Sequence, residues 1–291
     1  MTELLPVLLK ITIVIFMVGN LLDLGLRIDL KKAVAGLRDV RFVTLSVLWA
    51  FVLCPALAYG LGVMLPLTQP YAMGLLLLGL APCAPLLPGM VDTAHGDVNY
   101  AASFMLLTAA GTVVYMPITV PLLVEGLTVS AWTVAKPMLF MVLIPLLIGI
   151  TIQLRQPAFA ASAHPYVKKA TGIDTLLMLL LVVVMYAKGF SAALGTWAIL
   201  AQVLFFTLTI VGSYALAFGI PPARKSVMTL GLSTRNVGAA MAPLFVATDI
   251  APEATVMVSL GIPMMGLFSY LAARVFAGRN APAGAAVPKA S

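Results

Sequence analysis

The sequence predicts an all-α polytopic membrane protein with nine transmembrane helices. Of the 291 residues, 62% are hydrophobic and only 9% are charged, whereas a soluble domain carries about 25% charged residues. The charges also cluster, and they leave apolar runs that fit the roughly 20 residues needed to cross the hydrocarbon core as a helix. Spanning strands would instead give alternating segments of about ten residues, a pattern that this sequence lacks.

The apolar runs define nine predicted spans, at residues 5–26, 42–64, 71–94, 98–124, 135–154, 170–188, 194–218, 227–248 and 253–274. The first run is preceded by no basic segment of the kind that opens a cleavable signal peptide, so we expect it to be retained as a helix. Residues 1–276 then form a single transmembrane unit. The remaining residues, 277–291, are rich in Ala, Pro and Gly, and we expect a disordered cytoplasmic tail.

Basic residues gather on one side when nine spans alternate across the bilayer. The loops after spans one, five and seven, together with the C-terminal end, hold 13 of the 17 Lys and Arg residues. The opposite side has only Lys10, Lys136 and Lys188 near its helix ends. The positive-inside rule therefore predicts a multi-pass protein of the cell membrane with its N-terminus outside and its C-terminus in the cytoplasm. The basic excess accordingly does not indicate nucleic-acid binding.

Two short sequence echoes suggest an internal repeat. CPALAYG (54–60) resembles SYALAFG (213–219), and LGLAPCAP (78–85) resembles LGLSTRNV (230–237), in the same order. Spans one to four (about 5–124) and six to nine (about 170–274) would then be related halves, with the span at 135–154 linking them. Equivalent helices lie five spans apart, and an odd offset inverts one half relative to the other. Inverted repeats are typical of secondary transporters.

The second echo marks a weak point in each half. The first half continues into closely spaced prolines, which remove amide donors and interrupt a helix: Pro82, Pro85 and Pro88. The matching place in the second half is polar: Ser233, Thr234, Arg235 and Asn236. Paired interruptions are typical of a transporter's binding site, so these residues form the candidate substrate-binding crossover. The alternative is that the prolines only kink a packed helix.

The stretches 74–104 and 229–246, with Gly96-Asp97-Val98 and Asn236 at matching positions, resemble the bile acid:sodium symporter family in its nine-helix form. GLRIDLKK (25–32) is also similar to a loop of that family. The resemblance implies a panel domain, a core domain and two discontinuous helices that cross near the membrane centre. It also implies sodium-coupled uptake of organic anions, without an enzymatic activity or a cofactor.

The family's sodium ligands are missing at the aligned positions, which hold Ala50, Leu87, Pro88, Ala101, Met105 and Gly231. These residues provide no hard oxygen in their side chains, and a thioether is a poor substitute. We therefore expect a secondary active transporter of a small or amphipathic organic anion that does not use the family's usual sodium sites. Its coupling ion is left open between sodium, a proton and none. The alternatives are a sodium symporter with rearranged ligands and a non-transporting membrane sensor.

Arg235 raises a separate question, because a guanidinium in the membrane centre costs about 2.5–3.5 kcal/mol or more. In one hypothesis it permanently replaces a structural cation by donating to unwound carbonyls around residues 82–88. In a second it also binds the substrate anion, and in a third it pairs with Asp23 or Asp174. Those two carboxylates are otherwise interpreted as capping groups or as proton-coupling residues. No metal-ligand spacing and no nucleophile–base pair is evident in the sequence.

Overall fold

The computed structural model describes residues 4–124, 130–247 and 251–280, and there its regular structure is helical apart from one isolated β-bridge. The helices are α1 (Leu4–Arg27), α2 (Leu30–Gly36), α3 (Val40–Leu48), η1 (Trp49–Leu53), α4 (Cys54–Met64), α5 (Gln69–Leu80), α6 (Leu87–Thr93), α7 (Val98–Leu123), α8 (Ala131–Met138), η2 (Leu139–Leu143), α9 (Ile144–Arg155), α10 (Pro157–Ala193), α11 (Ala198–Ala215), α12 (Pro222–Ser233), α13 (Val237–Val246) and α14 (Pro252–Asn280). In this part of the chain, seven continuous helices are long and apolar enough to cross a membrane.

These seven helices coincide with seven of the predicted spans, counting α3–η1–α4 and α8–η2–α9 as one helix each. The other two predicted spans, 71–94 and 227–248, are each divided into shorter helices, α5 with α6 and α12 with α13. An all-helical membrane protein is thereby confirmed. The nine-span topology and the inverted repeat stay predictions.

Two boundaries differ from the sequence-based expectation. The predicted span 170–188 is the middle of a longer helix, α10, which begins at Pro157 and follows α9 after the single residue Gln156. Proline suits the first turn of a helix, where its missing amide costs nothing, and helix therefore replaces most of the expected loop. α14 likewise continues to Asn280, so residues 277–280 of the predicted disordered tail are helical. The rest of that tail lies outside the described residues.

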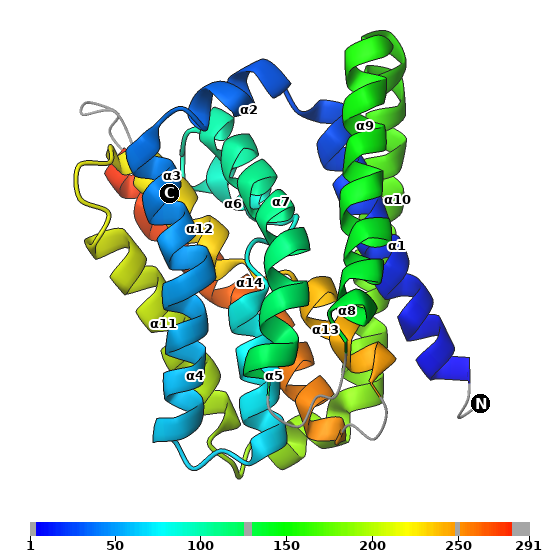
Figure 1. Ribbon diagram of the computed structural model, residues 1–291, viewed down its shortest axis with the longest axis vertical. Helices are drawn as coiled ribbons and strands as arrows, with labels where there is room; N and C mark the ends of the chain where they lie inside the picture. The colour runs from blue at the N-terminus through cyan, green and yellow to red at the C-terminus, as the bar shows by residue number, and fades with distance from the viewer. Residues whose placement is uncertain (1–3, 125–129, 248–250, 281–291) are drawn as a thin grey trace, which may run out of the picture.

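The helices form two groups that lie side by side (Figure 1). In the first, which we call the α1 group, α1 packs against α10 and against the η2 and α9 parts of the continuous helix α8–η2–α9. Gly25 and Gly149 bring α1 and α9 into backbone contact, because a Cβ at either position would lie 2.6 Å from a carbonyl oxygen of the other helix. Small residues permit such close approach between membrane helices, where dispersion contacts replace the hydrophobic effect as the driving force.

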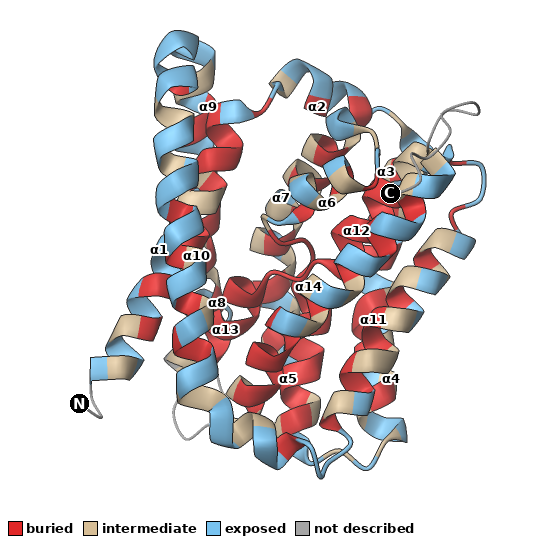
Figure 2. Cartoon of the chain, turned by 180° about the vertical axis from the view of Figure 1, so that it is seen from behind, coloured by how far each residue is buried: buried red, intermediate tan, exposed pale blue. Residues whose placement is uncertain are grey.

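The second group, which we call the central group, contains α3–η1–α4, α5, α6, α7 and α11 to α14. Its contacts are most extensive between α4 and α5, α5 and α14, and α11 and α12. Buried residues gather around α5, α12, α13 and α14, whereas α9 and α10 are exposed on their outer sides (Figure 2). The two broken helices therefore lie in the most enclosed part of the molecule.

Each π-helical segment ends two residues before a proline. η1 ends at Leu53, before Pro55, and η2 ends at Leu143, before Pro145. A proline clashes with the carbonyl four residues earlier and leaves it without a helical donor, and the wider π turn accommodates the clash. At Pro55 the carbonyl concerned is that of Phe51, and the Tyr115 hydroxyl of α7 donates to it at 2.6 Å. This bond satisfies a carbonyl that no water could reach within lipid.

A polar cluster joins the central group on the face that carries the basic loops. Asp39 caps α3 by accepting from the Phe42 amide at 3.1 Å, and its other oxygen accepts from the Tyr100 hydroxyl at 3.0 Å and the Arg224 guanidinium at 3.1 Å. Burial raises the pKa of Asp39, but these hydrogen bonds and the charge of Arg224 outweigh it, so the pKa is lowered from 3.8. The Arg224 guanidinium also lies 4.2 Å from the centre of the Tyr100 ring. The cluster thus ties together the starts of α3, α7 and α12.

Candidate functional site

Two chain breaks meet at the centre of the molecule. α5 ends at Leu80 and α12 ends at Ser233, and the segments that follow them pair in antiparallel fashion at Pro82 and Arg235. The Asn236 amide donates to the Ala81 carbonyl at 3.0 Å, and the Ala84 amide donates to the Thr234 carbonyl at 3.1 Å. Unwound backbone at membrane depth survives only where protein satisfies it. Here each break supplies partners to the other.

The prolines explain where the first break falls. In an unbroken helix the amide of residue 82 would donate to the Leu78 carbonyl, but Pro82 has no amide hydrogen. The Leu78 carbonyl instead accepts from Arg235 Nε at 3.0 Å and from the Ala81 amide at 3.2 Å. The next carbonyl, that of Gly79, accepts from Arg235 Nη2 at 2.8 Å. Arg235 therefore caps the C-terminal end of α5.

Arg235 also satisfies its own helix end, because Nη1 donates to the Leu232 carbonyl at 3.1 Å at the end of α12. One planar guanidinium thus joins the C-terminal ends of both broken helices. A cation is favourable there because the C-terminal end of a helix carries the negative end of its dipole. The sequence-based hypothesis that Arg235 donates to carbonyls around residues 82–88 placed the acceptors too late in the chain. They lie at Leu78 and Gly79, before the prolines, because the prolines deprive the preceding turn of donors.

The surroundings of Arg235 are fully enclosed by other residues. Its side chain is 0% exposed, and the guanidinium carbon lies 5.3 Å from the centre of the Phe205 ring. Among the described residues no carboxylate lies within ion-pair distance of it. Three carbonyl bonds, two helix dipoles and an aromatic face together stabilise the charge. The guanidinium is therefore enclosed by protein.

The carboxylates proposed as partners of Arg235 lie elsewhere. Asp23 of α1 pairs with Arg27 at 3.2 Å and approaches His164 of α10 at 3.3 Å. Asp174 is buried on α10, and its Oδ2 atom finds no hydrogen-bond partner among the described residues. Neither carboxylate reaches the crossing, so the hypothesis of an Arg235 pair with either of them is wrong. Proton coupling by these residues stays a prediction.

The remaining crossover residues point in different directions. The Asn236 side chain caps α13 by accepting from the Ala239 amide at 3.0 Å, and it also lines a cavity of about 20 Å³. Ser233 bonds to Ser269 of α14 at 2.8 Å, and Thr234 donates back to the Leu230 carbonyl at 2.9 Å. Both are 0% exposed. The structure therefore presents Asn236 to the cavity and turns Ser233 and Thr234 into the packing.

The small cavity, which we call the crossover cavity, lies on the boundary between the two helix groups. The central group contributes Pro82, Cys83, Pro85, Thr108, Thr112 and Asn236, and the α1 group contributes Leu21, Leu24 and Val142. Sequence reasoning identified the two prolines and Asn236 but missed Cys83 and the threonines. A usable signal existed, since Thr108 and Thr112 lie four residues apart and so share one face of a helix.

A larger cavity of about 230 Å³ lies next to this one, on the side of the basic loops. It shares Leu24 and Met105 with the crossover cavity, and its charged lining comes from Arg27, Asp29 and Lys32. Pro88, the third predicted proline, lines this second cavity. The two cavities thus lie side by side along the boundary, between the crossing and the basic face.

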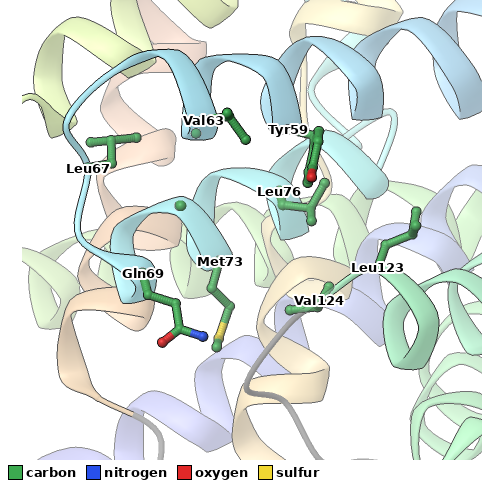
Figure 3. A pocket seen from close by; sticks show the side chains of 10 residues that line it. Tyr59, Val63, Leu67, Gln69, Met73, Leu76, Leu123 and Val124 are labelled. Carbon is green, nitrogen blue, oxygen red and sulfur yellow. The ribbon is translucent and has the colours of Figure 1, made fainter.

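Another cavity, of about 270 Å³, lies away from this boundary (Figure 3). Its walls come from α4, α5 and the end of α7, which all belong to the central group, and Tyr59 and Gln69 supply its polar atoms. Because it does not touch the α1 group, relative motion of the two groups would not open or close it. We assign it no role in transport.

The positions that the resemblance to the family aligns with sodium ligands are apolar and packed. Ala50, Leu87 and Ala101 are at most 1% exposed. A Cβ added to Gly231 would lie 2.3 Å from the Phe104 ring, so Phe104 occupies the space that an acidic side chain would need. In the described ranges no cluster of three or more His, Cys, Asp or Glu residues could hold a metal ion. The residues present do not fit the family's sodium ligands.

A model of the sodium bile acid symporter family matches residues 12–193, which is more than half of the chain. The matched region includes the proline-rich break and ends before the second break, so Arg235 lies outside it. No curated protein matches this chain.

Proposed function

The chain belongs to the sodium bile acid symporter family, a family of membrane transporters and not of enzymes, and from that premise we propose that it is a secondary active transporter of a small or amphipathic organic anion. The observation that carries the proposal is the pair of broken helices whose ends Arg235 joins at the boundary between two helix groups. Broken helices at a repeat interface are the usual place for a transporter's binding site.

Transport would proceed by alternating access, as the α1 group and the central group rock against each other. The crossover cavity supports this proposal, because its walls come from both groups and it shares Leu24 and Met105 with the larger cavity on the basic face. The positive-inside rule makes that face cytoplasmic. The N-terminus would then lie outside and the C-terminus inside.

We further propose that transport does not require sodium. A guanidinium and a sodium ion carry the same charge, and Arg235 supplies it permanently to the carbonyls that end the broken helices. Its enclosure supports a structural role over contact with substrate. The substrate anion would instead approach Asn236 and Thr108, which line the crossover cavity. That cavity has a volume of about 20 Å³, so it would admit the anion only when the two groups move apart.

The test is uptake by purified protein in proteoliposomes of neutral lipid. A panel of labelled organic anions that includes cholate would be offered in sodium, with potassium in place of sodium, and under an imposed pH gradient. We expect saturable uptake of at least one anion at equal rates in sodium and potassium. Strict sodium dependence would contradict the proposed role of Arg235 and favour a symporter with rearranged ligands. Uptake of neutral or cationic solutes alone would contradict the anion assignment.

A pair of variants ties uptake to the route. Ala102 lines the large cavity on the basic face and is partly buried, whereas Ala110 on the same helix is exposed. Ala102→Trp should fill the cavity and abolish uptake, while Ala110→Trp should leave it unchanged. Equal uptake by both variants would place the route elsewhere. Anion binding without any uptake by the unmodified protein would favour the membrane sensor.

A further inference from the structure

One face of α1 lines cavities along the whole depth of the molecule. Ile13 and Met17 line a cavity on the side opposite the basic loops, Leu21 and Leu24 line the crossover cavity, and Arg27 lines the cavity on the basic face. These residues are spaced three or four apart, which places them in one stripe along a helix. α1 is therefore the shared wall of all three spaces.

The first of these cavities has a volume of about 210 Å³ and lies, like the crossover cavity, between the two helix groups. α1 contributes Ile13 and Met17, α8 and η2 contribute Pro137 and Met141, and α13 contributes Phe245. Its lining is apolar except for Lys10. Flexible methionine side chains let such a surface adapt to apolar bodies of different shape.

Lys10 differs from the basic residues that line the cavity on the basic face. Arg27 and Lys32 already have carboxylate partners, Asp23 at 3.2 Å and Asp29 at 3.5 Å. In the described part of the chain no carboxylate lies within 4.0 Å of the Lys10 ammonium, which instead lies 5.8 Å from the centre of the Phe245 ring. Lys10 is exposed, so a ligand can reach it. The cavity therefore combines one accessible positive charge with an apolar interior.

We propose that Lys10 and this cavity form a docking site for the transported anion on the face opposite the basic loops. The ligand class is an amphipathic organic anion with a single negative group, which pairs with Lys10 while its apolar body lies against Met17, Met141 and Phe245. This inference rests on the proposed transport function and adds a first binding step before the crossover. Charge complementarity selects the anion over a neutral lipid.

The decisive measurement is the rate at which an amine-reactive acylating reagent modifies Lys10, followed by mass spectrometry. The full-length protein would be held in phosphatidylcholine vesicles, with and without cholate below its micelle concentration as the probe. We expect cholate to slow acylation of Lys10 and to leave Lys188 unaffected, because Lys188 is an exposed lysine of the same predicted side that does not line this cavity. Equal protection of both lysines, or of neither, overturns the docking site.

A transport measurement separates this inference from the proposed function. Lys10→Gln should raise the KM for cholate uptake about three- to tenfold, the scale of one hydrogen bond, with an unchanged maximal rate, and Lys10→Arg should restore it. Cholate uptake without protection of Lys10 overturns the docking site and leaves transport intact. Protection without uptake supports the docking site and contradicts transport. Protection by added phosphatidylglycerol in place of cholate assigns the site to lipid headgroups and also overturns the proposal.

Discussion

Replacing Arg235 with methionine tests whether the guanidinium holds the two broken helices together. Methionine keeps the length of the arginine stem, but it removes the three donors that bond the carbonyls of Leu78, Gly79 and Leu232 at 3.0, 2.8 and 3.1 Å. Hydrogen bonds to a charged group contribute about 1.5–3 kcal/mol each, and removing a charge from the membrane centre returns about 2.5–3.5 kcal/mol. The difference is a loss of roughly 2–6 kcal/mol in the free energy of unfolding.

The assay is thermal unfolding of the purified protein in detergent, followed by tryptophan fluorescence and by size-exclusion chromatography. A loss of that size lowers the Tm by about 10 °C, since 1 kcal/mol corresponds to about 2–4 °C in a chain of 150–250 residues. Arg235→Lys keeps the charge but not the planar fork, so its Tm should fall between those of the native protein and Arg235→Met. Arg38→Gln is the matched control, because Arg38 is exposed. An Arg235→Met protein that unfolds with the native Tm and loses only anion binding would refute the structural role and make Arg235 a substrate ligand.

Three further predictions concern the helices around the crossing. Because the pKa of Asp39 is lowered from 3.8 in the fold, Asp39 stabilises the protein above that pH and loses this contribution as pH falls below it. The Tm of the native protein should therefore drop below about pH 4 toward that of Asp39→Asn, and parallel curves for the two proteins would contradict this. Gly231→Ala should lower the Tm, because its Cβ would lie 2.3 Å from the Phe104 ring. Gly266→Ala is the control and should leave the Tm unchanged, because Gly266 has open space around it. Equal Tm values for the two variants would show that Phe104 moves freely. Tyr115→Phe should cost about 1 kcal/mol in urea unfolding by removing the 2.6 Å bond to a π-helical carbonyl, and no change would mean that another donor replaces the hydroxyl.

The helix ends around residues 155–169 show a limit of reasoning from charge. The loop predicted between spans five and six contained Arg155, Lys168 and Lys169, yet helix continues through nearly all of it. Basic residues mark the side of a membrane, but they do not end a helix. A helix ends where backbone donors or acceptors cannot be satisfied, and Pro157 can begin α10 directly after α9 because its first turn needs no amide.

The polar residues of the second break show a different limit. Ser233, Thr234, Arg235 and Asn236 form one polar run in the sequence, and the run alone does not tell which of them faces a cavity. In the structure only Asn236 lines the crossover cavity, while Ser233 meets α14 and Arg235 meets the end of α5. Directions that differ between neighbours are normal where a helix has ended, because the regular face of a helix no longer applies.

The sequence by itself determined that the chain is helical and membrane-embedded, because the length of an apolar run and the interruption of a helix by proline are local properties. It also located both breaks, at Pro82 and near Arg235. Only the tertiary structure decided which carbonyls the guanidinium reaches, that Phe104 occupies the space beside Gly231, and that Lys10 borders a cavity with α13. These are contacts between segments far apart in the chain, and they depend on how whole helices pack against one another.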